Sequence, residues 1–571
     1  MACSPRMMQR FSVLSNRAVP EQRHTTKSTG KHIPIMPGSK TPPQGVSQIP
    51  NRMNSISPID LLLSGTLFLL FCFCSFLAHY VHPGRPLFAD DAYYYFVVAR
   101  NIARSGQSTF DGFTLTNGYH PLWMAVLVVQ FKYLAQSLLL TRLVEFGLGV
   151  IALLSSLVFI KLPNTLLNLL FTTGFYLLLS RIALNGMETT LFACCFCLFV
   201  CCASRQSENV VAYGFLDGLL AAGAIASRLD AAVFVLPFLF FVSRSLLRRS
   251  VSFGITLGAG LFYMLVNRAC FGVALPVSGE VKSLGGLQLN QKFWQILARP
   301  DQSVGTLLYM TIILAIISPY VYRRVQDHAT RSLLLAYIVG LAIYGIRLSF
   351  FSSWTIWPWY GYPALLGYLG CAPFLLLVAD KSLTNTFTYR QLLTAVSALF
   401  AVFFGYSMLR LARGHHAEPY GFYAINRKAL DEYGSTLKDA RIAMGDRAGN
   451  FAYEYPGGVS QLEGLVNDRE FLEILKEHGD VKSFLCRQDI QYLIAYEPDL
   501  GSYKTHQVQT IRRVLSQYAA PVIDVQHEDE VGKVFDLSAF NDQAIDNNSY
   551  LYIWKLNCDK KVDLFGVQRL K

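Results

Sequence analysis

Two adjacent carboxylates, Asp90 and Asp91, follow the first long apolar run of the chain in the stretch FADDAYYYFVVAR. Neighbouring carboxylates repel, and near a membrane the repulsion costs more unless a cation or a substrate neutralises it. A divalent metal with oxygen ligands would do so, whereas without a metal one acid should have a raised pKa and suit a catalytic base. A structural alternative makes Asp90 a helix cap and Asp91 a first-turn acid.

Three further stretches place polar side chains at the ends of apolar runs. NGYHPLW carries Tyr119 and His120, NGMETTLF carries Glu188, and ASRLDAAVF carries Arg228 and Asp230. Ionisable groups in such positions are costly and usually face a cavity or a partner, so they are candidates for function. For His120 a hydrogen bond at a helix start is the simpler alternative. Arg228 and Asp230 could form a structural ion pair, although residues two apart on a helix point to different faces.

A third group of candidates lies in loops expected outside the membrane. Cations there could hold a phosphate, and aromatic rings could stack on a sugar. An aromatic belt at the membrane interface is the alternative for the rings. The residues are Lys282, Arg347, Trp354, Trp357, Trp359 and Tyr360.

The elements that must position these residues are membrane helices. The chain has 571 residues, of which 52% are hydrophobic and only 15% charged, which excludes a string of ordinary soluble domains. Residues 61–80 carry no charge and match the roughly 20 residues that cross a bilayer as a helix. Similar runs predict roughly 11–13 transmembrane helices, near 122–140, 143–160, 165–180, 189–203, 211–226, 231–243, 251–269, 304–322, 333–346, 361–379 and 391–409.

Charge in the connecting segments predicts the orientation. Residues 1–58 hold many Lys and Arg against the single acid Glu21, which indicates a disordered cytoplasmic tail and needs no nucleic-acid partner. Basic stretches at 244–250, 322–331 and 380–390 are also expected to be cytoplasmic, which puts Asp90 and Asp91 outside. The number of membrane crossings counted forward from Asp90 differs by one from the number counted backward from Arg248, and the difference arises between residues 120 and 205. One short run there must therefore be two half-helices or lie in the interface.

Beyond residue 410 the composition changes to that of a soluble α/β domain, predicted over 411–571. Segments 440–446, 490–496, 520–525 and 550–556 are expected to be strands, and stretches ending in Gly434 and Gly479 are expected to be helices. Cys486 and Cys558 both fall in this domain and could pair in an oxidising compartment. The cysteines at 194–202 are expected to pack as small apolar side chains.

The ordered set of stretches resembles the bacterial polytopic glycosyltransferases of the GT-C superfamily. The likeness rests on DDAYYYFVVARNIARSG, STFDGFTLTNGYHPLW, NGMETTLFA, SRLDAAVF, WPWYGYP and a terminal MGDRAG and LEGLV domain, and runs from about residue 60 to beyond 495. The chain is more distantly similar to the mycobacterial arabinofuranosyltransferases. The resemblance implies a GT-C-like transmembrane domain over 59–410, whose first external loop, 83–120, is catalytic.

What the resemblance implies is an inverting transfer of a sugar from a polyprenyl-phosphate donor to a glycan or lipid acceptor during cell-envelope glycan assembly. Asp90 and Asp91 would be catalytic, one of them as the base. Asp91 with Glu188 would hold a divalent cation (Mg, Mn or Ca) where a metal is used. Tyr119, His120, Arg228, Asp230, Lys282, Arg347, Trp357, Trp359 and Tyr360 would bind substrate. The site and the terminal domain would lie on the periplasmic face of a bacterial inner membrane.

Two other classes remain as alternatives. A polytopic transporter of an anionic or lipid-linked solute would also have ionisable groups and short helices in the membrane, but it should show paired repeats, and none is found in the sequence. A transporter also gives no reason for an acidic pair on an interfacial helix. An adhesion or assembly module would need only one membrane anchor. Among enzymes, a phosphoryl or acyl transferase acting on lipids is the nearest competitor.

Overall fold

The computed structural model describes residues 56–80, 87–205, 208–284, 286–298, 303–352, 354, 356–384, 391, 420–445, 447–477, 481–496, 529–534 and 551–558. The predicted tail lies outside these residues up to position 55. The span predicted over 391–409 also lies outside them, except for its first residue. The strand predicted over 520–525 lies outside them as well.

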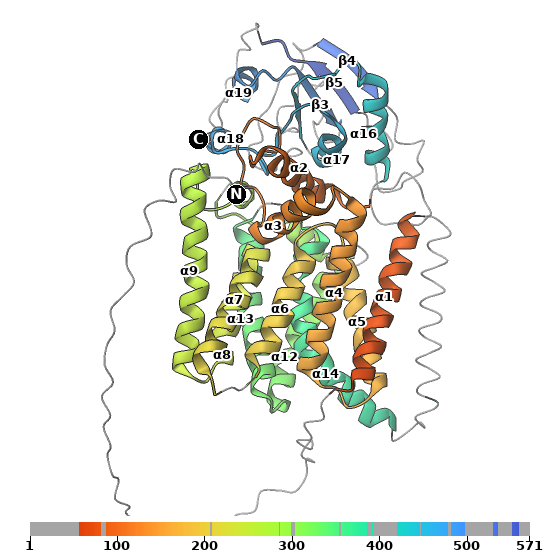
Figure 1. Ribbon diagram of the computed structural model, residues 1–571, viewed down its shortest axis with the longest axis vertical. Helices are drawn as coiled ribbons and strands as arrows, with labels where there is room; N and C mark the ends of the chain where they lie inside the picture. The colour runs from red at the N-terminus through yellow and green to blue at the C-terminus, as the bar shows by residue number, and fades with distance from the viewer. Residues whose placement is uncertain are drawn as a thin grey trace, which may run out of the picture. The chain divides into compact units, whose positions relative to one another are not determined.

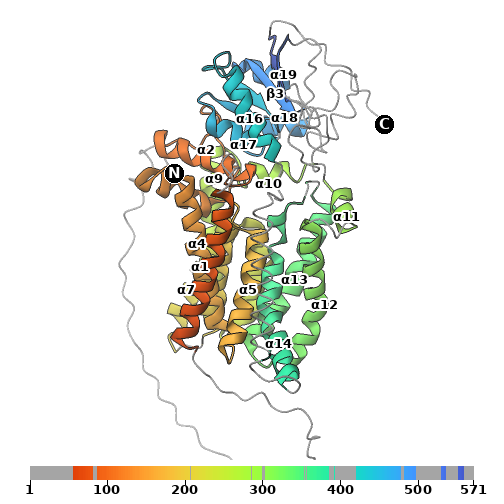
Figure 2. The same ribbon diagram turned by 90° about the vertical axis from the view of Figure 1, so that its right-hand side faces the viewer.

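The described part of the chain contains eight helices that are long and apolar enough to cross a membrane. They run side by side in one bundle (Figures 1 and 2). Three shorter apolar helices accompany them, so the predicted polytopic helical fold is confirmed. The eight are α1 (Pro58–Tyr80), α4 (Leu138–Ile160), α5 (Thr165–Ile182), α7 (Val210–Ser227), α9 (Leu246–Phe271), α12 (Ser303–Arg324), α13 (His328–Phe350) and α14 (Pro363–Thr384).

One of the three shorter apolar helices corrects a predicted span. The run 122–140 was expected to cross the membrane, but it forms only α3 (Pro121–Val129) and a π-helical turn (Gln130–Leu134). Its apolar helix is too short to cross, and both views show α3 lying across the bundle end beside α2 (Asp90–Ser105) (Figures 1 and 2).

At the opposite end of the bundle, three helices begin with capping side chains. Asn164, Ser245 and Asp327 each accept a hydrogen bond from a backbone N–H three residues further on, at the starts of α5, α9 and α13. Such caps satisfy orphan N–H groups where the chain re-enters a helix. The remaining helices of the bundle and its polar end are α6 (Thr189–Ala203), α8 (Ala232–Val242), α10 (Val277–Val281) and α11 (Gln291–Leu297).

The C-terminal segment carries a small mixed sheet. Its order is β2-β1-β3-β5-β4, with β2, β1 and β3 parallel and β5 antiparallel to both its neighbours. The predicted strands at 440–446, 490–496 and 550–556 are confirmed, whereas the short β2 was not predicted. The elements are α16 (Tyr420–Tyr433), β1 (Ile442–Met444), α17 (Ala448–Glu454), β2 (Val459–Gln461), α18 (Arg469–Glu477), α19 (Val481–Arg487), β3 (Tyr492–Tyr496), β4 (Asp529–Val534) and β5 (Leu551–Lys555).

A disulfide joins Cys486, in α19, to Cys558, just after β5. The sequence left this pairing open. The bond ties a helix to the strand β5, which lies near the middle of the sheet. It closes a loop of 72 residues, the kind of crosslink that stabilises a small domain by restricting its unfolded chain.

The buried apolar residues of the described part form two clusters. One fills the bundle and includes Phe175, Phe196 and Tyr337. The other is continuous from α2 and α3 into the C-terminal domain, so that Phe96 and Trp123 share it with Ile442 and other strand residues. Helix α2 therefore packs with the core of the domain, although it follows the first membrane helix in the sequence.

Candidate functional site

The adjacent acids Asp90 and Asp91 both lie in the first turn of α2, where the N-cap is Ala89. The expectation that Asp90 is the cap is therefore wrong. The carboxylate of Asp90 accepts backbone hydrogen bonds from Gly449 and Asn450, at 3.2 and 2.8 Å, whereas Asp91 lines a cavity. Because neighbouring residues on a helix point about 100° apart, one acid can face the domain while the other faces the cavity.

The cavity has a volume of about 500 Å³. Its walls come from α2, the loop before α3, α10, the end of α13 and the segment after β2, which supplies Leu465 and Val466. Ten of the thirteen side chains nominated from the sequence line it: Asp91, Tyr119, His120, Glu188, Arg228, Asp230, Lys282, Arg347, Trp359 and Tyr360.

The other three nominated residues, Asp90, Trp354 and Trp357, do not line the cavity. The indole of Trp357 is 41% exposed and stacks on Trp359, with ring centroids 5.7 Å apart. Trp359 itself is buried and faces the cavity, so only the inner ring of the stacked pair is available to a ligand there.

Glu188 is the centre of a buried polar network at the start of α6. One of its carboxylate oxygens lies 2.9 Å from Nη1 of Arg228, and 3.7 Å from Nε2 of His120. The other accepts a hydrogen bond from the hydroxyl of Tyr95, at 2.9 Å. Both oxygens are therefore engaged, which offsets the desolvation of a carboxylate that is almost fully buried.

Arg228 joins Glu188 to Asp230. The Nε atom of Arg228 lies 3.0 Å from a carboxylate oxygen of Asp230, so the ion pair held open by the sequence is present and the expectation of opposite faces is wrong. The reason is local, because α7 ends at Ser227, Arg228 is extended, and a 3-10 turn (Leu229–Ala231) follows before α8. A regular helix would have separated the two side chains.

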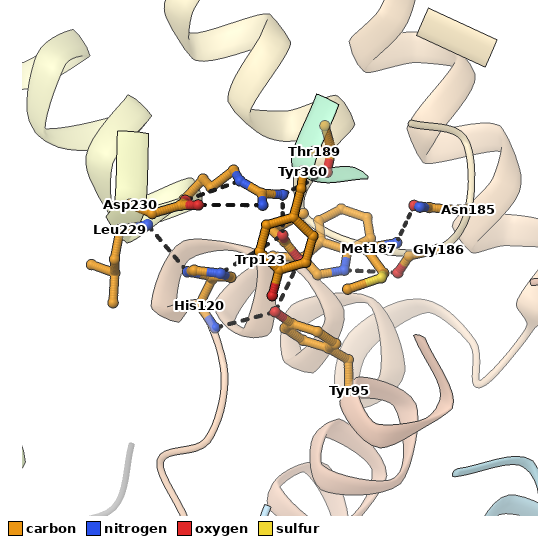
Figure 3. A network of polar contacts seen from close by, with 12 residues as sticks. Tyr95, His120, Trp123, Asn185, Gly186, Met187, Thr189, Leu229, Asp230 and Tyr360 are labelled. Carbon is orange, nitrogen blue, oxygen red and sulfur yellow. Dashed lines mark hydrogen bonds and ion pairs between the residues drawn. The ribbon is translucent and has the colours of Figure 1, made fainter. Parts of the chain in front are cut away.

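The imidazole of His120 bonds across the site and does not cap its own helix. Its Nδ1 accepts a hydrogen bond from the backbone N–H of Leu229, at 3.2 Å, and no side-chain cap bond forms at the start of α3 (Figure 3). Burial lowers the pKa of His120. A neutral ring whose Nδ1 accepts must carry its proton on Nε2, the atom that faces Glu188.

Lys282 and Arg347 add positive charge to the lining of the cavity. The ammonium of Lys282 lies 5.8 Å from the ring centre of Trp354 and 5.9 Å from that of Tyr360. Burial alone would lower the pKa of Lys282, but Tyr360 and Asp91 raise it and the net direction is upward. Lys282 is therefore charged at neutral pH and lies within the electrostatic reach of Asp91.

The predicted metal pair, Asp91 and Glu188, does not fit a divalent cation. Both oxygens of Glu188 are occupied by donors, and the guanidinium of Arg228 is 2.9 Å from one of them, where it would repel a metal ion. The nearby charges of Lys282 and Arg347 add to that repulsion. Among the described residues no group of three or more His, Cys, Asp or Glu side chains could hold a metal.

One buried ion pair that supports the site was not nominated from the sequence. Arg142 and Glu145 lie one turn apart in α4, with their charged atoms 2.9 Å apart. Arg142 donates to the carbonyls of Leu87 and Leu184, and Glu145 accepts from the N–H of Gly186, at 2.8 Å. The pair thereby holds the two loops that lead to Asp91 and Glu188. Two charges within an apolar stretch, TRLVEF, are the signal that could have identified it.

Tyr95 and Tyr344 are two further polar groups of the cavity that were not singled out in the sequence. Tyr95 lies within the run AYYYF, where its neighbours have the same residue type, so nothing in the pattern distinguishes it. Gly186 also matters to the site. Its φ of +87° suits glycine, and a Cβ there would come within 2.7 Å of Ala92 and Phe88.

No family model and no curated protein matches the chain. Among solved structures the chain is similar to ArnT from Cupriavidus metallidurans, with 13% identity and a TM-score of 0.46, covering 86% of this chain and 98% of that one. It is also similar to arabinofuranosyltransferase AftD from Mycobacteria, with 12% identity and a TM-score of 0.46, covering 88% of this chain and 42% of that one. The second belongs to the group of enzymes that the sequence resembles more distantly.

Proposed function

We propose that the protein is a membrane glycosyltransferase that moves a sugar from a polyprenyl-phosphate donor to a glycan or lipid acceptor on the external face of the membrane. The observation that carries the proposal is the sharing of one cavity, at the polar end of the bundle, by Asp91, Lys282 and Arg347. A carboxylate beside two cations is the set of charges that a transfer from a phosphate leaving group requires.

The chemistry assigns one role to the acid and another to the two cations of the cavity. The Asp91 carboxylate takes the proton of the acceptor hydroxyl while that oxygen forms a bond to the anomeric carbon of the sugar. The bond from this carbon to the phosphate oxygen breaks, and the lipid phosphate leaves with the electron pair. Lys282 and Arg347 stabilise the charge on the departing phosphate. A single displacement of this kind inverts the anomeric configuration.

The buried network around Glu188 holds neighbouring side chains of the cavity in place for this reaction. Its charges are already paired within the protein, so Glu188 and Arg228 position Tyr95 and His120 and do not supply a metal ligand. The faces of Trp359 and Tyr360 border the same space and suit the apolar face of a sugar ring.

An external site is supported by charge and by the disulfide. The basic stretches 244–250 and 322–331 adjoin turns at the bundle end opposite α2 and α3, the cytoplasmic side by the positive-inside rule (Figure 1). The disulfide between Cys486 and Cys558 fits an oxidising compartment, such as the periplasm of a bacterium.

The transporter alternative expects a binding site near the middle of the membrane. The cavity instead lies where α2, α10 and a segment of the C-terminal domain meet, and it touches the eight long spans only at the end of α13 and at the start of the span Pro358–Asp380. This position favours an enzyme working at the membrane surface.

Donor consumption by the purified, full-length protein tests the proposal. A panel of labelled polyprenyl-phosphate sugars and a crude glycan acceptor would be offered to the wild type, to Asp91→Asn, and to Asp431→Asn as a control acid exposed on α16. We expect wild type and Asp431→Asn to consume one donor and Asp91→Asn to be at least about 100-fold slower, because a positioned base contributes that much.

Equal turnover by the folded Asp91→Asn protein would remove Asp91 from the chemistry. Absence of donor consumption by the wild type, with solute flux in liposomes, would favour the transporter. Loss of wild-type turnover in a chelator would contradict the misfit between Glu188 and a metal.

A further inference from the structure

The contact between α2 and α17 has the form of a clamp. At one end of α2 the Asp90 carboxylate accepts hydrogen bonds from the N–H groups of Gly449 and Asn450, at 3.2 and 2.8 Å. About three turns further along α2, the guanidinium of Arg100 donates to the carbonyls of Tyr453 and Ala452, at 2.7 and 3.1 Å. An acid thus meets the start of α17 and a base meets its end, as the dipole of α17 favours.

Helix α17 depends on these bonds. It has seven residues, its N-cap Arg447 makes no side-chain cap bond, and so short a helix is marginal by itself. The N–H groups that donate to Asp90 belong to the first turn of α17, and the carbonyls that accept from Arg100 belong to its last turn. At these two ends a helix leaves its own backbone groups unpaired. The caps that α17 needs therefore come from α2.

The middle of the contact is apolar and close. The ring of Tyr453 lies 5.4 Å from that of Tyr93 and 6.3 Å from that of Phe96, and both α2 residues are almost fully buried. Residue 449 must be glycine, because a Cβ there would come within 2.5 Å of the Asp90 carbonyl oxygen and 3.2 Å of the Tyr93 Cβ. The two helices are thus held without room for a shift.

We propose that the C-terminal domain positions the cavity acid Asp91 by clamping α2, with Asp90 and Arg100 as positioning residues. Asp91 follows Asp90 in the same helical turn, so a rotation of α2 that released Asp90 would also turn Asp91. The domain supplies a part of the wall of the same cavity through Leu465 and Val466. The clamp therefore sets the distance between Asp91 and that wall. Its catalytic consequence rests on the proposed function, while the clamp itself does not.

The first arm of the test needs no activity. In the full-length protein, Asp91→Cys would be alkylated alone and combined with Gly449→Ala, and peptides from α2 and α17 would be followed by hydrogen exchange. The protein without Asp91→Cys gives the background from native cysteines. Gly258→Ala, in α9 where a Cβ meets open space, is the matched control. We expect Gly449→Ala to speed exchange in both helices and to change the alkylation rate about tenfold, and Gly258→Ala to do neither.

The second arm measures turnover. We expect Gly449→Ala and Asp90→Ala each to lower kcat about 100-fold with donor KM nearly unchanged, because a base displaced by about 1 Å loses that much. Asp90→Asn keeps an oxygen that accepts an N–H and should recover most of the loss. The double variant Asp90→Ala with Gly449→Ala should be no slower than the slower single variant, because both break one contact.

The outcomes separate the two proposals. If Gly449→Ala changed neither the hydrogen-exchange rates of α2 and α17 nor the alkylation rate at residue 91, the clamp would be overturned, whatever the activity. Faster exchange with an unchanged alkylation rate would show a clamp that does not position residue 91, which also overturns the inference. A wild type that consumes no donor, with both rates changed in Gly449→Ala, would leave the clamp standing and overturn the proposed function alone.

Discussion

Burial decides the charge of His120, one of the residues at the centre of the cavity. Its ring accepts the N–H of Leu229 and lies 3.7 Å from Glu188, and desolvation lowers its pKa below the ordinary 6.5. The folded protein therefore binds a proton at this ring less readily than the unfolded chain does. By linkage, the stability that His120 contributes is fully present above about pH 6.5 and decreases as the pH falls below that value.

We expect His120→Asn to destabilise the protein more at about pH 8 than at about pH 5.5, since the wild type alone carries this acid-induced loss. Asn can still accept the Leu229 N–H, so the variant should fold. The measurement is the difference in Tm between the two proteins in detergent at each pH. Other histidines, such as His328, are present in both proteins and cancel. A Tm difference that is equal at both pH values, or larger in acid, would contradict this account.

At the scale of elements, the start of α4 holds the site together. The ion pair of Arg142 and Glu145 binds the loop before α2 and the loop before α6 at the same time. Gly186 belongs to the loop before α6, and its carbonyl accepts a hydrogen bond from the indole of Trp123 in α3, at 3.0 Å. Three helices that come from separate parts of the sequence thus meet at one turn of α4.

We expect Glu145→Ala to lower the free energy of unfolding by about 3 kcal/mol, because it leaves Arg142 as a buried charge without its carboxylate partner. Glu208→Ala, which removes an exposed acid just before α7, is the control and should change stability by less than about 0.5 kcal/mol. Thermal unfolding in detergent measures both. Similar Tm values for the two variants would mean that the pair does not stabilise the folded protein.

The sequence predicted the components of the site better than their partners. Ionisable groups at the ends of apolar runs are rare and costly, and this alone led to Glu188, Arg228 and Asp230. Their pairing depends on a break in the helix after Ser227, which no Pro or Gly marks. The roles of Asp90 and Asp91 could not be separated either, because their division depends on α17, which lies more than 350 residues away along the chain.

Most of the fold was predictable because apolar length decides which segments cross a membrane. The exception was the run 122–140, whose hydropathy resembles that of a span. Its polar side chain Gln130 bonds to Ser137 and Thr141, and so ends the helix in a tight turn. An average hydropathy over the run hides a single polar residue such as Gln130, although that residue ends the helix.

At the scale of the whole molecule, the two ends of the bundle carry different elements. One end carries α2, α3 and the C-terminal domain, whose buried residues form a continuous cluster. The other end has short turns with basic residues nearby. We expect this polarity to match the membrane, with the cavity end outside and the turns in the cytoplasm.

Labelling with a membrane-impermeant thiol reagent measures this orientation. In intact cells Glu473→Cys, on the exposed face of α18, should react, while Arg244→Cys, in the exposed turn after α8, should react only after permeabilisation. The wild type reports the background from native cysteines. Labelling of Arg244→Cys before permeabilisation, with none at Glu473→Cys, would show the opposite orientation.

The contribution of Leu465 and Val466 to the cavity has a consequence for biosynthesis. Asp91 is translated early and inserts with the first helices, whereas the wall that faces it is made only after every described membrane helix. After Arg347 has been made and before Leu465 is made, a nascent chain can therefore hold its acid and its cations at the membrane without enclosing a substrate between them. Under the proposed function, the protein would become active only when the segment that carries Leu465 and Val466 has folded against α2, so partly synthesised copies would not compete for the donor.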